Sequence, residues 1–237
     1  MEVKLKLILE KIHWSLIFKS LFLGLIWFFL PFWIFFCVIL LFYFIPIFRP
    51  AHLLFQFLIF IFISKIIEIS LLNFLFLTIL IFLIFGIKDL IIIRRDLAYQ
   101  ILGLLYFFIL ILKFFEKFGS EFNWSTIIFS FLLSIIFILF FKNKIFFETN
   151  LNNFNYLNFK IGLGIMAFLI WQLILVLCFL PMNFYLQTAI LILFISLGFE
   201  TIIHYAVFGL NKQFILANSL IFSIIFLIIL SFNNWAL

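Results

Sequence analysis

Long apolar runs, separated by short polar or charged stretches, make up most of the chain. The clearest runs are Ala51 to Ile67, Leu71 to Ile87, Leu97 to Leu112, Trp124 to Phe141, Ile161 to Leu180, Phe184 to Phe208 and Phe214 to Phe232. These runs are apolar on every face, whereas strands of a membrane barrel would alternate apolar and polar residues. Helices also satisfy their own backbone hydrogen bonds in lipid. The pattern therefore predicts an all-α, polytopic transmembrane helical bundle of eight or nine spans with little extramembrane structure.

The apolar run from Ser20 to Ile47 leaves two interpretations open. As one helix it would be about 42 Å long at about 1.5 Å per residue, against a hydrocarbon core of about 30 Å. It is either one tilted or kinked span, which gives eight spans in all, or a hairpin that turns near Pro31, which gives nine. Trp27 and Trp33 flank Pro31 and would lie at a membrane interface if the chain turns there.

The distribution of basic residues favours the hairpin. With eight spans, Lys and Arg divide as seven on the N-terminal side and eight on the other. With nine spans, twelve lie on the N-terminal side and only Lys65, Lys113 and Lys117 lie opposite. Because basic residues prefer the cytoplasmic side, we expect a cytoplasmic N-terminus and an external C-terminus.

A charged island from Gly86 to Gln100 separates two of the runs. Its basic residues Lys88, Arg94 and Arg95 are expected to determine the topology by holding this loop in the cytoplasm. The apolar residues from Leu90 to Ile93 indicate that the island lies on the membrane surface.

Two other polar segments complete the expected organisation of residues 1–237 as a single integral membrane domain. Residues 1–19 carry lysines among apolar residues, which is typical of a basic interfacial segment. Residues 142–160 are rich in asparagine and are expected to form a polar cytoplasmic loop.

Composition supports a membrane location and indicates which kinds of partner the chain contacts. The chain is 69% hydrophobic and 10% charged, whereas soluble domains have about half apolar and about a quarter charged residues. Its 43 Phe, with few Ala and Gly, indicate a coding sequence rich in A and T, which favours a low-GC bacterium or an organelle genome; of these we expect the bacterial inner membrane. The net charge of +6 is dispersed over segment ends, so we expect contact with the lipid bilayer, anionic lipid head groups and other membrane-protein subunits, and no nucleic acid.

Small and polar residues inside the runs indicate helix contacts. Ser130-xxx-Ser134 and Gly162-x-Gly164, with Ala167 nearby, are positions where two helices can approach closely. Gln56 beside His52, and Gln172 beside Trp171, are candidates for hydrogen bonds between helices.

The candidate chemistry lies at Glu200 and His204. Residues four apart on a helix share a face, and an ionisable residue inside a span is by default a functional hypothesis. In the alternative interpretation the span ends near Phe199, which leaves both residues at the cytoplasmic interface.

The chain contains no His-Glu-x-x-His, Gly-x-Ser-x-Gly or Gly-rich phosphate motif, so no cofactor or metal is expected. The favoured hypothesis is a non-enzymatic membrane component, either a transport subunit or a scaffold of a complex. The alternatives are an intramembrane enzyme that acts on a lipid-linked or membrane-protein substrate, and a permease for small solutes or ions. Both alternatives would use Glu200 and His204.

Overall fold

The computed structural model describes residues 14–45, 53–88, 95–118, 123–142, 155–180, 182–209 and 212–231. All regular secondary structure in these ranges is helical, which confirms the all-α fold. Within these ranges, six helices are long and apolar enough to cross a membrane. They are α5 (Leu71–Lys88), α6 (Arg95–Phe118), α7 (Trp124–Lys142), α9 (Tyr156–Phe179), α10 (Phe184–Phe208) and α11 (Lys212–Ser231).

Three further apolar helices are shorter: α2 (Trp14–Phe29), α3 (Phe32–Phe44) and α4 (Leu54–Ile66). They have 16, 13 and 13 residues, which correspond to about 24, 20 and 20 Å at about 1.5 Å per residue. Because these lengths fall below the hydrocarbon thickness of about 30 Å, six spans are supported and a total of eight or nine is not shown.

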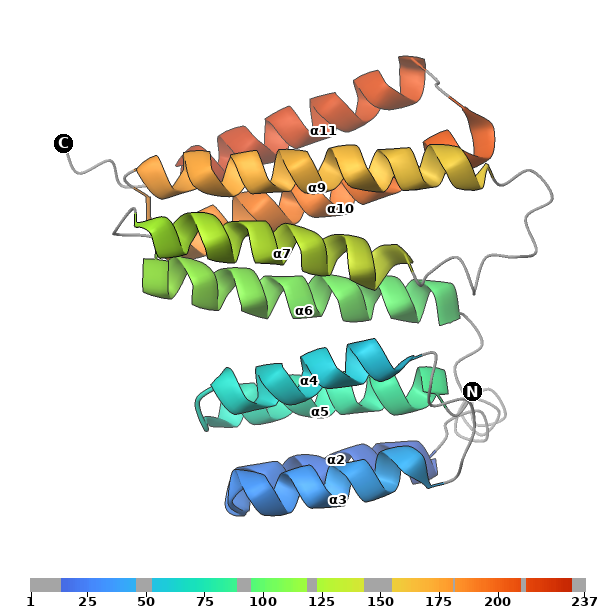
Figure 1. The fold of residues 1–237 in the computed structure, drawn as a ribbon, viewed down its shortest axis with the longest axis vertical. Coiled ribbons are helices and arrows are strands. Elements are labelled where there is room, and N and C mark those ends of the chain that lie inside the picture. The colour runs from blue at the N-terminus through green and yellow to red at the C-terminus, as the bar shows by residue number, and fades with distance from the viewer. Residues whose placement is uncertain are drawn as a thin grey trace, which may run out of the picture. The chain divides into compact units, whose positions relative to one another are not determined.

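The chain divides into two compact units, residues 1–102 and residues 103–237. In the first unit, α2 ends at Phe29 and α3 begins at Phe32, with Pro31 as the N-cap of α3. The two helices fold back on each other, and the ring centroids of Phe22 and Phe42 lie 6.3 Å apart. The predicted turn at Pro31 is therefore confirmed (Figure 1).

The core of the first unit forms where α3 packs against α2 and α4, and where α2 lies against α5. Trp27 is only 4% exposed, and its indole Nε1 donates a hydrogen bond of 2.9 Å to the Ser64 carbonyl of α4. Trp33, by contrast, is 74% exposed. The two tryptophans beside Pro31 thus differ: Trp27 joins two helices inside the unit, and Trp33 remains on the surface.

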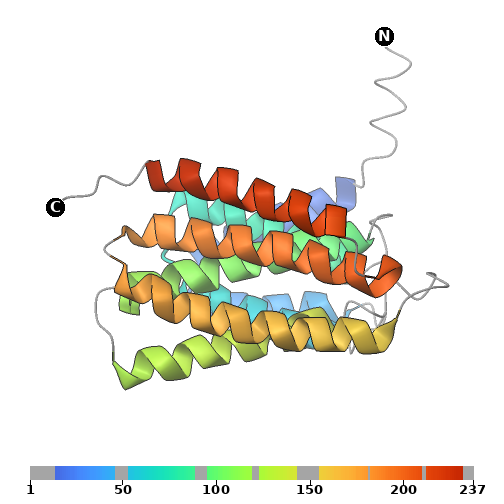
Figure 2. The same ribbon diagram turned by 90° about the horizontal axis from the view of Figure 1, so that it is seen from above.

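The second unit contains most of α6 together with α7, α9, α10 and α11. α10 packs against both α9 and α11, and these three helices lie side by side in both views (Figures 1 and 2). The Asn155 side chain caps α9 by accepting from the Leu157 and Asn158 amides. The backbone N–H of Asn155 donates a hydrogen bond to the Ala206 carbonyl, which fixes the start of α9 near the end of α10.

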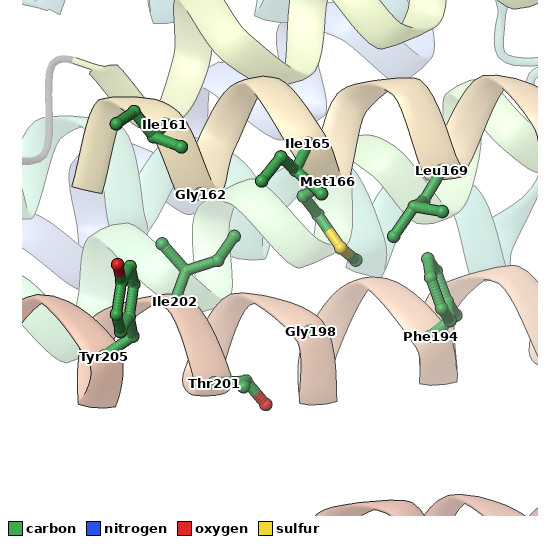
Figure 3. Close-up of a pocket in the computed structure, with 10 residues that line it drawn as sticks. All are labelled: Ile161, Gly162, Ile165, Met166, Leu169, Phe194, Gly198, Thr201, Ile202 and Tyr205. Atoms are coloured by element: carbon green, nitrogen blue, oxygen red, sulfur yellow. The ribbon is translucent and has the colours of Figure 1, made fainter. Parts of the chain in front are cut away.

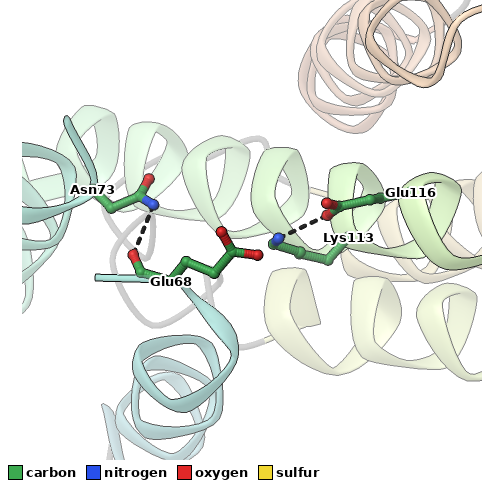
Figure 4. A network of polar contacts seen from close by, with 4 residues as sticks. All are labelled: Glu68, Asn73, Lys113 and Glu116. Atoms are coloured by element: carbon green, nitrogen blue, oxygen red, sulfur yellow. Dashed lines mark hydrogen bonds and ion pairs between the residues drawn. The ribbon is translucent and has the colours of Figure 1, made fainter. Parts of the chain in front are cut away.

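Two predicted boundaries shift by five residues or more. α6 continues to Phe118 instead of ending at Leu112, and its last turns carry an ion pair of 2.7 Å between Lys113 and Glu116 (Figure 4). α9 begins at Tyr156, so the last five residues of the expected 142–160 loop are helical, while residues 143–154 lie outside the described part. Of the expected interfacial segment 1–19, residues 14–19 form the start of α2 and the rest is likewise outside.

Candidate functional site

The structure places Glu200 and His204 in the C-terminal half of α10. The helix continues without interruption to Phe208, so it does not end near Phe199. Glu200 is exposed, whereas Phe199 and Ile202 on either side of it are 5% and 7% exposed. Glu200 therefore lies on the face of α10 turned away from the core of the unit.

His204 is held by a different set of neighbours. Its ring stacks on Phe214 of α11, with centroids 3.8 Å apart and planes 10° apart, and it also lies 5.1 Å from the Phe208 ring. Within the described residues the Glu200 side chain makes no hydrogen bond or ion pair, with His204 or otherwise. The two residues share a helix but do not form a joint site in this structure.

Metal binding by clustered side chains has no support in the described ranges. Among those residues no three of His, Cys, Asp and Glu lie close enough to hold an ion. His52, which the sequence pattern paired with Gln56, lies outside the described part of the chain.

The charged island contributes to packing in a way that the sequence did not indicate. Lys88 is only 2% exposed, and its Nζ donates a hydrogen bond of 2.5 Å to the Tyr43 carbonyl at the end of α3. The last carbonyls of a helix lack partners within it and carry its negative end, so an ammonium group is a favourable cap. Lys88 thereby joins α5 to α3. Arg94 and the apolar residues 90–93 lie outside the described part, and Arg95 begins α6.

Lys19 lies close to the same aromatic ring as Lys88. The two ammonium groups lie 4.5 and 5.4 Å from the centroid of Phe85, within the usual range of a cation–π contact. Both ammonium groups therefore contact the same buried ring, although Lys19 itself remains partly exposed.

Gln56 confirms the expectation of a hydrogen bond between helices. It is fully buried, and its Nε2 donates to the hydroxyl of Tyr99 near the start of α6. The sequence identified Gln56 but not its partner, because Tyr99 stands 43 residues further along the chain within the charged island.

An apolar groove with a volume of about 480 Å³ lies between α9 and α10. Its walls are Ile161, Gly162, Ile165, Met166 and Leu169 from α9, and Phe194, Gly198, Thr201, Ile202 and Tyr205 from α10 (Figure 3). We refer to these ten residues as the α9–α10 groove.

Small residues set the shape of this groove. A Cβ at Gly162 would lie 3.0 Å from the Ile202 side chain, and a Cβ at Gly198 would overlap the end of Met166. Gly162 thus confirms the predicted close approach of helices, whereas a Cβ at Gly164 would have no neighbour within 4 Å, so Gly164 takes no part. Ser130 and Ser134 are both buried, as their spacing suggested.

Comparisons of the chain with protein-family models, with curated proteins and with solved structures found no match.

Proposed function

We propose that this chain is a non-enzymatic component of a membrane complex, a transport subunit or a scaffold, in which the Glu200 face of α10 binds another subunit. The observation that carries the proposal is the outward position of Glu200 on a long helix that contains no Lys, Arg or other acidic residue. A carboxylate on such a face requires a compensating group, and the described part of this chain supplies none.

The contacts of α10 with α9 support a position of Glu200 below the membrane surface. Gly198 lies against Met166 and Ile202 against Gly162, so Glu200 is level with the third turn of α9. Eight residues separate Glu200 from the end of α10 at Phe208, which corresponds to about 12 Å along the axis. An unpaired charge near the centre of a span costs about 2.5 to 3.5 kcal/mol on insertion scales.

A second subunit would remove this cost by placing a Lys, Arg, Asn or Gln side chain opposite Glu200. The occupant is therefore expected to be a transmembrane helix with one such residue at matching depth. An intramembrane enzyme or a permease would need Glu200 and His204 to act on one substrate, and the separate surroundings of the two residues give those alternatives less support.

The same proposal includes the full topology. The six long helices and the three short ones would all cross the bacterial inner membrane, with a cytoplasmic N-terminus and with anionic lipid around the basic ends.

A photo-cross-linking experiment in native membranes tests the Glu200 face. A benzoylphenylalanine at Ile203, which is partly exposed near Glu200, is expected to cross-link one protein of defined mass. Glu200→Leu should abolish that product, whereas Glu200→Gln, which keeps a hydrogen-bonding group, should retain part of it. The same cross-linker at Val176, exposed on α9, is the control. A product that survives Glu200→Leu, or lipid adducts alone, would contradict the proposal.

A further inference from the structure

The α9–α10 groove occupies about one leaflet of a membrane. It extends from Ile161 to Leu169 on α9, eight residues that correspond to about 12 Å along the helix axis. Half of a hydrocarbon core of about 30 Å is about 15 Å. The groove therefore begins near one end of the helices and stops near their middle, where Leu169 and Phe194 lie (Figure 3).

The walls of the groove suit an apolar chain. The Thr201 hydroxyl is already used, since it donates to the Leu197 carbonyl and accepts from Asn218 of α11. In Figure 3 the Thr201 side chain points away from α9. The remaining inner wall is aliphatic or aromatic, and its volume of about 480 Å³ lies in the range of known ligand pockets, about 300 to 1,000 Å³.

The end of the groove at the helix termini carries one polar group, the Tyr205 hydroxyl, and has a lysine at the same end of the helices. The Tyr205 ring rises from α10 toward α9, with its hydroxyl directed to the end of the groove where Ile161 lies (Figure 3). This hydroxyl makes no hydrogen bond within the described residues. The exposed Lys212 begins α11 at the same end, because Phe214 packs on His204 and Asn218 bonds to Thr201. Glu200, the acidic residue nearest in sequence, is on the outward face of α10.

We propose that the α9–α10 groove binds an anionic phospholipid. One acyl chain lies between α9 and α10, and the phosphate accepts a hydrogen bond from the Tyr205 hydroxyl and is attracted by the Lys212 ammonium group. The charge of Lys212 distinguishes this occupant from a zwitterionic lipid, whose head group carries its own cation. The site is separate from the Glu200 face and does not depend on the proposed function.

Photoactivatable lipids test the site in the full-length protein reconstituted in bilayer nanodiscs. Phosphatidylglycerol and phosphatidylcholine that carry the same diazirine acyl chain are cross-linked, and the labelled peptides are identified by mass spectrometry. The expected result is phosphatidylglycerol label concentrated in residues 161–169 and 194–205, at least threefold above phosphatidylcholine label. Similar label on the exposed face of α11, around Ile224 and Ile228, would show only annular lipid and overturn the proposal.

Matched variants test separately the binding of the acyl chain in the groove and the attraction of the head group by Lys212. Ile165→Trp fills the groove and should reduce the label at least threefold, whereas Val176→Trp on the same helix should not; the two native side chains are 57% and 55% exposed. Leu169→Trp provides a second block should Ile165→Trp fail to fold. Lys212→Gln should remove the preference for phosphatidylglycerol, and Lys142→Gln, at the exposed end of α7, should leave it. Label that persists in both groove variants, or a preference unchanged by Lys212→Gln, would overturn the proposal.

Discussion

Among single residues, a few side chains control how the apolar helices pack. Glycines are decisive because lipid provides no hydrophobic force between helices, so close contact of their surfaces must hold them together. Gly103 is an example, since a Cβ there would lie 2.6 Å from the ring of Phe140 and 3.1 Å from that of Phe141. Both rings are fully buried.

Gly103→Ala is therefore expected to destabilise the second unit by about 1 to 3 kcal/mol, the usual cost of overpacking a filled core. Gly164→Ala is the matched control, because its Cβ would meet open space and alanine favours helix by up to about 1 kcal/mol. Thermal unfolding of the two variants in the same detergent measures the difference. Equal midpoints would show that the α6–α7 contact at Gly103 is not tight.

Other single residues were only partly predictable. The sequence identified Gln56 because a buried amide needs a hydrogen-bond partner, and in the structure that partner is the Tyr99 hydroxyl. Lys88 looked like a surface charge that orients the chain, yet it is buried and caps α3. A lysine at the end of an apolar run has the same local sequence in both situations, so only the position of α3 distinguishes them.

Among the helices and turns, the turn at Pro31 is the feature that most affects the topology. Proline has no backbone N–H and fits the first positions of a helix, where that donor would be unpaired. The sequence indicated the turn through charge balance, and the structure shows α2 and α3 folded on each other.

A cysteine-labelling experiment tests whether this hairpin crosses the membrane. In a background with Cys37 and Cys178 replaced by Ser, single cysteines at Ser15, Leu30 and Ile45 are treated with a membrane-impermeant maleimide. We expect labelling at position 30 in intact cells, and at positions 15 and 45 only after permeabilisation. Reaction of positions 15 and 45 from opposite sides would contradict a membrane-crossing hairpin.

The other helices follow their predicted ranges closely, because long uniform apolar runs leave little choice of secondary structure in lipid. The errors are at the ends. α6 extends past Leu112 since Lys113 and Glu116 pair along one helical face, and α9 starts early since Asn155 caps it.

For the chain as a whole, nine crossings would place its two ends on opposite sides of the membrane. A fluorescent protein that folds only in the cytoplasm should be active at the N-terminus, and alkaline phosphatase, which is active only outside, should be active after Leu237. This expectation follows from the twelve basic residues on the N-terminal side against three on the other. Both ends on one side would indicate an even number of spans.

Composition and local pattern were enough to predict that lipid surrounds most of this protein and that its fold is all-α. A chain that is 69% hydrophobic, with apolar runs of helical length, can hide its backbone polar groups in lipid as helices. Charge distribution and Pro31 also located the hairpin. These properties depend on residue content and on neighbouring residues, which a sequence records directly.

Only the three-dimensional packing shows which faces of the helices meet. Uniformly apolar runs have no polar face to indicate the inside, so the sequence did not distinguish the buried Trp27 from the exposed Trp33. For the same reason it did not show that Glu200 and His204 have separate surroundings, or that Gly162 and Gly198 shape a groove. Those outcomes depend on contacts between residues far apart in the chain, which no local pattern encodes.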